Sequence, residues 1–172
     1  MLRPTIPEDT PALLEMAERT GVFKPHEVEA LAGVLDDYHN GLNEPGELAF
    51  TWDDGGPAGF VYFGPAPMTD RTWDLWWIIV SKTRQGKGLG GRLLDFVEQT
   101  VRQEGGRLLL IETSSLPHYE PTRQFYLKRG YAVTARVPDF YADGDDKVIF
   151  AKRITSTPAS PQFADTSSGR RA

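Results

Sequence analysis

Hydrophobic positions along the chain follow two spacings, one typical of strands and one typical of helices. A short strand at residues 1–5 is followed by two segments in which apolar residues recur every three or four positions. The first segment begins at the Pro-Glu-Asp cluster after Ile6 and ends at Gly21, and the second begins at Pro25 and ends near Gly41. We therefore expect two helices after the first strand.

The spacing changes to two from Glu47 onward, which predicts strands. Residues 48–52 and 58–63 flank an Asp-Asp-Gly-Gly-Pro turn and form a predicted hairpin. The next strand, residues 72–80, has two mostly apolar faces, so we expect it at the centre of a sheet, covered on both sides. Strict alternation predicts one face made of Trp73, Leu75, Trp77 and Ile79, and the other of Thr72, Asp74, Trp76, Ile78 and Val80.

The second half of the chain adds two helices and three strands. The predicted elements are a helix from Leu89 to the glycine pair at 105–106, a strand at 107–113, a helix that ends at Gly130, and strands around 131–137 and 147–153. The order β α α β β β α β α β β describes an antiparallel meander that leads into one βαβ crossover. This order predicts the α+β class, with a mixed, mostly antiparallel central sheet flanked by helices.

Composition narrows the classes of function. The 172 residues, 40% hydrophobic and 25% charged, suit one globular domain over residues 1–154. Residues 155–172 are rich in Ser, Thr and Pro, and we expect a disordered tail there. The chain has no cysteine, which excludes disulfides, thiolate metal sites and a cysteine nucleophile. The three histidines are scattered, so no metal site is expected: His26, His39 and His118.

Charge and hydropathy exclude two kinds of partner. The net charge of −5 argues against a protein that follows nucleic-acid phosphates. No stretch approaches the roughly 20 apolar residues that cross a bilayer, and the first residues lack the apolar core of a signal peptide. We therefore expect no nucleic-acid or membrane partner and a cytoplasmic location.

The strongest local signal is the glycine-rich segment at residues 85–91, which connects the strand 72–80 to the following helix. Free N–H groups and the dipole at a helix start favour an anionic group such as a pyrophosphate, and glycines allow its close approach. Four glycines in six residues exceed what a tight turn requires, because each glycine costs a helix about 1 kcal/mol. We interpret the segment as a phosphate-binding loop.

A dinucleotide could also bind such a loop. Gly86-x-Gly88-x-x-Gly91 fits the dinucleotide fingerprint, and Glu112 lies about 20 residues beyond it, where the ribose-binding acid is expected. However, five residues (81–85) separate the strand from the first glycine, and the antiparallel hairpins leave no room for a parallel dinucleotide sheet. The dinucleotide interpretation is the weaker one.

The same segment contains Gln85-x-x-Gly88-x-Gly90, which resembles the acetyl-CoA pyrophosphate loop of the GNAT superfamily of N-acetyltransferases. Residues 125–131, Phe-Tyr-Leu-Lys-Arg-Gly-Tyr, resemble the Phe-Tyr-x-x-x-Gly-Phe/Tyr helix end of that family, and residues 2–4 with two helices resemble its opening. The resemblance covers nearly the whole chain before the tail. It implies a sheet whose parallel central strand pair splays apart to admit acetyl-CoA.

The resemblance also implies which residues bind the cofactor. The strand end would pair with the pantetheine arm, and the glycine-rich loop would hold the pyrophosphate. Many family members carry an asparagine seven residues before the Phe-Tyr tyrosine, where this chain has Tyr119. The implied cofactor-binding residues are Ile78, Ile79, Val80, Gln85, Gly86, Lys87, Gly88, Leu89, Gly90, Gly91, Tyr119 and Tyr126.

Acetyl transfer to an amine requires a base and an acid. By the resemblance, Tyr126 lies beside the cofactor sulfur, and its hydroxyl stays protonated at neutral pH and suits a general acid. Asp74 and Glu112 lie in strands that read as buried, where the pKa of a carboxyl group rises and suits a base. The residues leave open which of the two acts, or whether water relays the proton.

The resemblance implies acetyl transfer from acetyl-CoA to a primary amine of a small molecule or a protein, by direct attack and without a metal. Acidic and aromatic residues at Tyr119, Glu120 and 139–146 would attract a cationic acceptor if they border the site. The acidic run at 139–146 is equally typical of a solvated turn, and the residues leave this alternative open. Dimers are common in the family, so a homodimer fits the resemblance. The alternative is a non-catalytic acyl-CoA-binding or regulatory module on the same fold.

Overall fold

The computed structural model describes residues 1–154, so the predicted tail at 155–172 lies outside the described residues. Seven strands form one sheet in the order β1-β2-β3-β4-β5-β7-β6. Neighbouring strands are antiparallel except β4 and β5, which are parallel, so the predicted element order and the mixed, mostly antiparallel sheet are confirmed. The strands are β1 (Leu2–Pro4), β2 (Leu48–Asp53), β3 (Pro57–Pro65), β4 (Thr72–Val80), β5 (Leu108–Ser114), β6 (Ala132–Ala142) and β7 (Asp145–Arg153).

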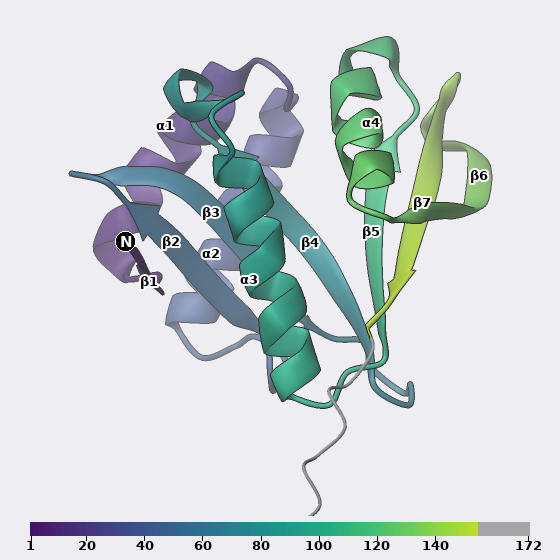
Figure 1. The fold of residues 1–172 in the computed structure, drawn as a ribbon. Coiled ribbons are helices and arrows are strands. Elements are labelled where there is room, and N and C mark those ends of the chain that lie inside the picture. The colour runs from purple at the N-terminus through teal and green to yellow at the C-terminus, as the bar shows by residue number, and fades with distance from the viewer. Residues whose placement is uncertain (155–172) are drawn as a thin grey trace, which may run out of the picture.

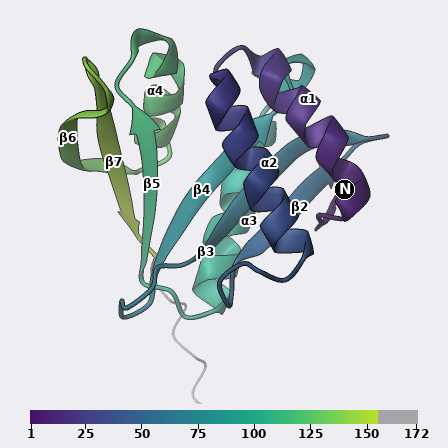
Figure 2. The same cartoon turned by 180° about the vertical axis from the view of Figure 1, so that it is seen from behind.

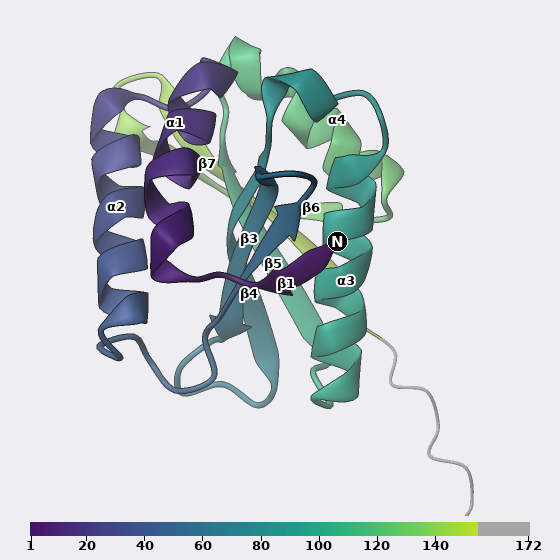
Figure 3. The ribbon, with the colours of Figure 1, turned by 90° about the vertical axis from the view of Figure 1, so that its left-hand side faces the viewer.

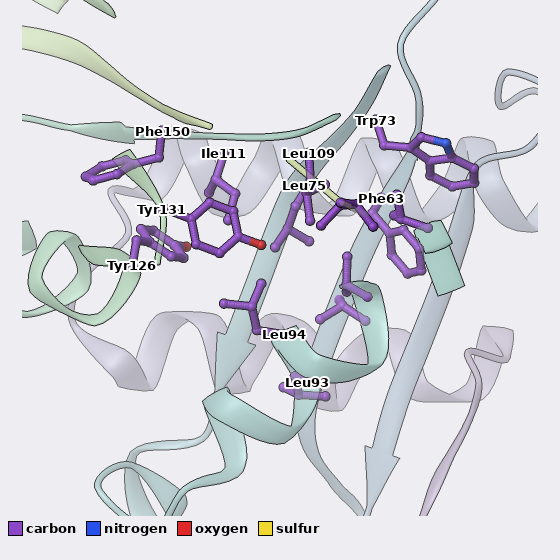
Figure 4. Packing of buried hydrophobic residues seen from close by; sticks show 14 of the residues in the cluster. Phe63, Trp73, Leu75, Leu93, Leu94, Leu109, Ile111, Tyr126, Tyr131 and Phe150 are labelled. Atoms are coloured by element: carbon purple, nitrogen blue, oxygen red, sulfur yellow. The ribbon is translucent and has the colours of Figure 1, made fainter. Parts of the chain in front are cut away.

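Two pairs of helices cover the sheet. Helices α1 (Thr10–Thr20) and α2 (Pro25–His39) lie on one face, and α3 (Leu89–Gln103) and α4 (Glu120–Lys128) lie on the other (Figures 2 and 3). The core is divided in the same way. One cluster joins α1 and α2 to the sheet. A second cluster, shown in Figure 4, joins α3 and α4 to it.

A β-bulge in β4 corrects the predicted alternation of that strand. In β3, Tyr62 pairs with Trp77 while the next residue pairs with Leu75, so Trp76 is the extra residue of β4. Before the bulge, Leu75 joins the cluster beneath α3, whereas after it Trp77 faces α1 and α2. The two halves of the strand therefore bury opposite faces, and Trp76 is itself 40% exposed rather than covered.

The parallel pair β4–β5 separates along its length. The two strands pair only from Thr72 to Leu75 in β4 and from Leu108 to Ile111 in β5. Beyond those residues they part, with α3 over one side of the opening and α4 over the other (Figure 1). The predicted splayed pair is confirmed. On the face that carries α1 and α2, no helix of residues 1–154 covers β5, β7 and β6 (Figure 2).

The last hairpin is longer than the sequence predicts. Strand β6 continues to Ala142 instead of ending at Val137, and β7 begins at Asp145. Only Asp143 and Gly144 form the turn, so most of the acidic segment 139–146 belongs to strands rather than to a loop. None of the helices in residues 1–154 is long and apolar enough to cross a membrane.

Candidate active site

The glycine-rich loop leaves four consecutive N–H groups free at the start of α3. Gly86 and Gly88 have positive φ angles of 71° and 83°, which turn the chain from the end of β4 into the helix. Gly88 is the N-cap and has no side-chain hydrogen bond, and the first helical bond runs from Arg92 N to Gly88 O. Within residues 1–154 no acceptor binds the N–H groups of residues 88–91, which are therefore available to an anion.

Three side chains in and just before the loop hold it in place. The Gln85 Nε2 donates to the carbonyl of Val80 at 3.1 Å, which ties the loop to the end of β4. The Lys87 Nζ donates to the Thr83 carbonyl at 2.9 Å, and Arg84 forms an ion pair with an aspartate of the β2–β3 turn, Asp54. These contacts tie the loop to the end of β4 and to the β2–β3 turn.

The end of β4 has an unpaired edge beside the loop. From Trp77 to Val80 the strand pairs with β3 on one side and has no strand partner toward β5. Ile79 is buried against α1 and α2, while Ile78 and Val80 pack at the cluster beneath α3. Backbone groups on the open edge can accept or donate hydrogen bonds to an extended ligand.

Tyr126 lies in the core beneath α3 and α4. Its ring is 3% exposed and contacts Phe150 and Tyr131 at centroid distances of 5.4 and 6.0 Å (Figure 4). Burial, and to a lesser extent Tyr119, raises the pKa of Tyr126 well above its ordinary value. The phenol therefore stays neutral, and no residue of the described chain hydrogen-bonds its hydroxyl group.

Tyr119 ends the short turn Pro117–Tyr119 that leads into α4. Burial raises its pKa, followed by the charges of Glu27 and Asp145. The charge of Tyr119 in turn contributes to the raised pKa of Tyr126. Glu120, the next residue, binds Arg123 and Gln124 of its own helix, so its carboxylate stabilises the first turns of α4.

The two candidate bases occupy different surroundings. Leu75 and Ile111 face α3, so their neighbours Asp74 and Glu112 lie on the other face of the sheet. Burial raises the pKa of Asp74, and the charge of Glu112 adds to this; in residues 1–154 its carboxylate has no hydrogen-bond or ion-pair partner. The expectation of a buried carboxyl is wrong for Glu112, which is 45% exposed and pairs with Lys147 at 2.7 Å.

Further charged and aromatic groups line the same side of the opening. Burial raises the pKa of Tyr141 to about 12, and the charges of Glu112, Asp145 and Glu27 add to it. Asp145 is 3% exposed and pairs with Lys24, at the start of α2, at 3.5 Å. No local pattern singles out Lys24 or Glu27, because only the fold brings the start of α2 to the β6–β7 hairpin. Residues 1–154 contain no group of three side chains placed to bind a metal ion.

Comparison with known proteins agrees with this arrangement. A sequence profile of the acetyltransferase (GNAT) family matches residues 11–131. A GNAT-family protein of known structure from Desulfovibrio desulfuricans is 36% identical, with a TM-score of 0.83 over 90% of this chain and 99% of that one. Among curated protein sequences, none matches this chain.

More distant structures share the fold. The ribosomal-protein-S18-alanine N-acetyltransferase of Escherichia coli is 19% identical, with a TM-score of 0.71 over 95% of this chain and 98% of that one. An aminoglycoside 6'-N-acetyltransferase in complex with coenzyme A is 21% identical, with a TM-score of 0.72 over 92% of this chain and 99% of that one. With one parallel strand pair in its sheet, this fold also shows that the dinucleotide interpretation is wrong. The chain belongs to the GNAT family of acetyltransferases.

Proposed function

We propose that the protein transfers the acetyl group of acetyl-CoA to a primary amine by direct attack, and that residues 1–154 are the whole catalytic domain. The proposal rests on one observation, the set of free N–H groups at residues 88–91 next to the unpaired edge of β4. The loop would bind the pyrophosphate and the edge would bind the pantetheine arm, through the twelve residues that the family resemblance implies. A structural neighbour with bound coenzyme A supports this assignment.

Acid and base would act from opposite sides of the sheet. Asp74 lies on the open face, which is the sheet face opposite α3 and α4. It would take a proton from the amine as the amine nitrogen attacks the thioester carbonyl. Deprotonating an amine with an ordinary pKa of 10.4 costs roughly 4.6 kcal/mol at pH 7. This is the cost that the base would have to offset. Tyr126 lies on the face covered by α3 and α4, where the C–S bond breaks, and would protonate the leaving thiolate.

The acceptor would be cationic. Glu27 and the unpaired Asp74 place negative charge on the side of the sheet that the amine would approach, and Tyr141 offers an aromatic surface there. Two structural neighbours are named for amine acceptors, one for aminoglycosides and one for the alanine of a ribosomal protein. Both classes carry a primary amine, which is the group this site would use.

Thermal unfolding with acetyl-CoA, and with NADH as the control nucleotide, tests the cofactor. A ligand at 100 times its Kd adds about 2.7 kcal/mol to the free energy of unfolding. We expect stabilisation by acetyl-CoA alone. A panel of polyamines, aminoglycosides, lysine peptides and free peptide N-termini then tests transfer, read as release of free thiol. Binding without transfer to any amine would favour the non-catalytic acyl-CoA-binding module.

A further inference from the structure

The side chain of Arg129 ties the end of α4 to the first turn of α3. Its Nη2 donates to the carbonyl of Gly91 at 2.7 Å and also binds the carboxylate of Asp95, one turn further along α3. The main-chain N–H of Arg129 donates to the carbonyls of Phe125 and Tyr126 at 3.2 and 3.0 Å. One residue therefore closes the last turn of α4 and contacts the cofactor loop.

A second bridge, formed by Lys152, also connects α3 to the end of α4. The Lys152 Nζ, on β7, donates to both carboxylate oxygens of Glu98 at 2.9 and 2.8 Å, and Glu98 lies on α3. The same Nζ donates to the main-chain carbonyl of Arg129 at 3.0 Å. Tyr131 completes the set, since its hydroxyl donates to Glu98 at 3.0 Å. The main chain at Arg129 is thus fixed on one side while its guanidinium reaches across to α3.

These bridges cross the line where the sheet divides. Helix α3 lies over the β4 side of the opening, and α4 lies over the β5 side (Figure 1). Beyond Leu75 and Ile111 no strand pairing holds the two sides together. Side-chain contacts between α3 and α4 therefore help to set how far apart the two sides stand.

The glycine at position 91 fits this contact. Its backbone does not have a positive φ, so the turn itself does not require glycine there. A Cβ atom at this position would lie 3.3 Å from the Arg129 Nη2, which is closer than nine in ten contacts of real Cβ atoms, so the guanidinium would have to shift by a few tenths of an ångström. The absence of a side chain at Gly91 leaves room for the guanidinium to reach the helix carbonyl.

We propose that Arg129 is a positioning residue, which holds Tyr126 at the correct distance from a cofactor bound at the start of α3. The inference rests on the proposed function, because it needs the loop as cofactor site and Tyr126 as acid. The pyrophosphate would be bound by backbone groups of α3, whereas Tyr126 belongs to α4. Losing the bridge should leave cofactor binding intact and misplace the acid, and small misplacements of reacting groups cost large factors in rate.

Kinetics of Arg129→Met test the proposal, with Arg107→Met as the matched control. Arg107 also joins a main-chain carbonyl and a carboxylate, both of Asp70, at 2.6 and 3.6 Å, but at the far end of β5. Their side chains are similarly exposed, 32% for Arg129 and 39% for Arg107. We expect Arg129→Met to lower kcat about tenfold with a nearly unchanged Kd for coenzyme A, and Arg107→Met to change neither.

A double variant shows whether Arg129 acts through the acid. In the Tyr126→Phe background, Arg129→Met should cause little further loss of kcat, because the group that it positions is already gone. The proposal would be overturned if the kcat losses of the two single variants multiplied in the double variant. It would also be overturned if Arg129→Met and Arg107→Met behaved alike. Failure of the proposed function is distinct, since it would leave Tyr126→Phe as active as the unaltered protein or show no transfer at all.

Hydrogen exchange measured with coenzyme A tests the bridge without any acceptor. In the unaltered protein, the ligand should slow exchange at the start of α3 and also in α4. In Arg129→Met the protection of α3 should remain while that of α4 disappears. Protection of α4 that persists in the variant, or that is missing in the unaltered protein, would contradict the coupling.

Discussion

The Nζ of Lys147 lies 2.7 Å from Oε2 of Glu112 and 3.6 Å from the centre of the Phe140 ring. Glu112, one of the two acidic residues on the open sheet face, therefore already has a counterion in Lys147. The ring of Phe140 in turn contacts this lysine. Asp74 has none, and its pKa is raised by burial first and by Glu112 second. This contrast favours Asp74 as the proposed base and assigns Glu112 an indirect effect on it.

Turnover should respond differently to the loss of each carboxylate. Asp74→Asn removes the proposed base and should lower kcat/KM by about 10²–10⁴. Glu112→Gln removes a group that is already paired, so we expect a change below about tenfold. Steady-state kinetics with one amine and saturating acetyl-CoA measure both. Similar, near-normal rates in the two variants would mean that water relays the proton.

The pKa of Asp74 should move in opposite directions when its two charged neighbours are replaced. Glu112→Gln removes a like charge, so the pKa of Asp74 should fall and the acid limb of kcat/KM should move to lower pH. Lys147→Met removes the cation that lowers this pKa, so the limb should move to higher pH. Carbon-13 NMR titration of the Asp74 carboxyl checks the same shifts without an acceptor. A common direction in both variants would refute this assignment.

Asp74 should also reduce the stability of the protein at neutral pH. Because its folded pKa is raised, the folded state favours the protonated form, and this contribution is lost as pH rises through the folded pKa. Asp74→Asn should therefore raise Tm at pH 7.5, and the gain should shrink near pH 4. Asp70→Asn is the control of opposite sign, since Arg71 lowers the pKa of Asp70. Thermal unfolding at both pH values measures the effect; a lower Tm for Asp74→Asn at pH 7.5 would contradict it.

Replacing Tyr126 should separate catalysis from binding. Tyr126→Phe keeps the ring that packs in the core and removes a hydroxyl without a hydrogen-bond partner in residues 1–154, so the fold should keep its stability. Loss of the acid should lower kcat by about 10²–10⁴, while the Kd of acetyl-CoA stays nearly unchanged. Titration calorimetry and steady-state rates measure the two quantities. Unchanged turnover would remove Tyr126 from the mechanism.

Two glycines with similar backbones can show whether the loop binds the cofactor. Gly88 and Gly41 have φ angles of 83° and 69°, and a Cβ at either would meet no atom within 4 Å. Alanine at each should destabilise the fold by about 1–2 kcal/mol through the left-handed conformation. Only Gly88→Ala should also weaken acetyl-CoA binding, because it disturbs the free N–H groups. Equal affinities in the two variants would place the cofactor elsewhere.

Local spacing predicted the fold well, because most helices and strands can be recognised from the period of their hydrophobic positions and from glycine or proline at their ends. The prediction of α4, which ends at Lys128 shortly before Gly130, and of the strands around 58–63 and 107–113 needed no tertiary information. Within the candidate site, the loop at 85–91 was visible in the sequence for the same reason.

What the sequence could not show depends on pairs that are distant along the chain. The ion pair of Lys147 with Glu112 arises from the pairing of β5 with β7, and that of Lys24 with Asp145 from the approach of α2 to the last hairpin. Nor does any local pattern reveal that Trp76 is an extra residue, since both faces of β4 are apolar and either phase fits.

The extra residue at Trp76 divides β4 into two segments that are out of phase with each other. Deleting this single position would do more than shorten the strand. It would restore one continuous alternation, and either the Trp73–Leu75 half or the Trp77–Ile79 half would then turn its apolar side chains toward the wrong pair of helices. Exchanging Trp76 for another side chain should be far less harmful than removing it, so the length of this strand is under tighter constraint than its composition.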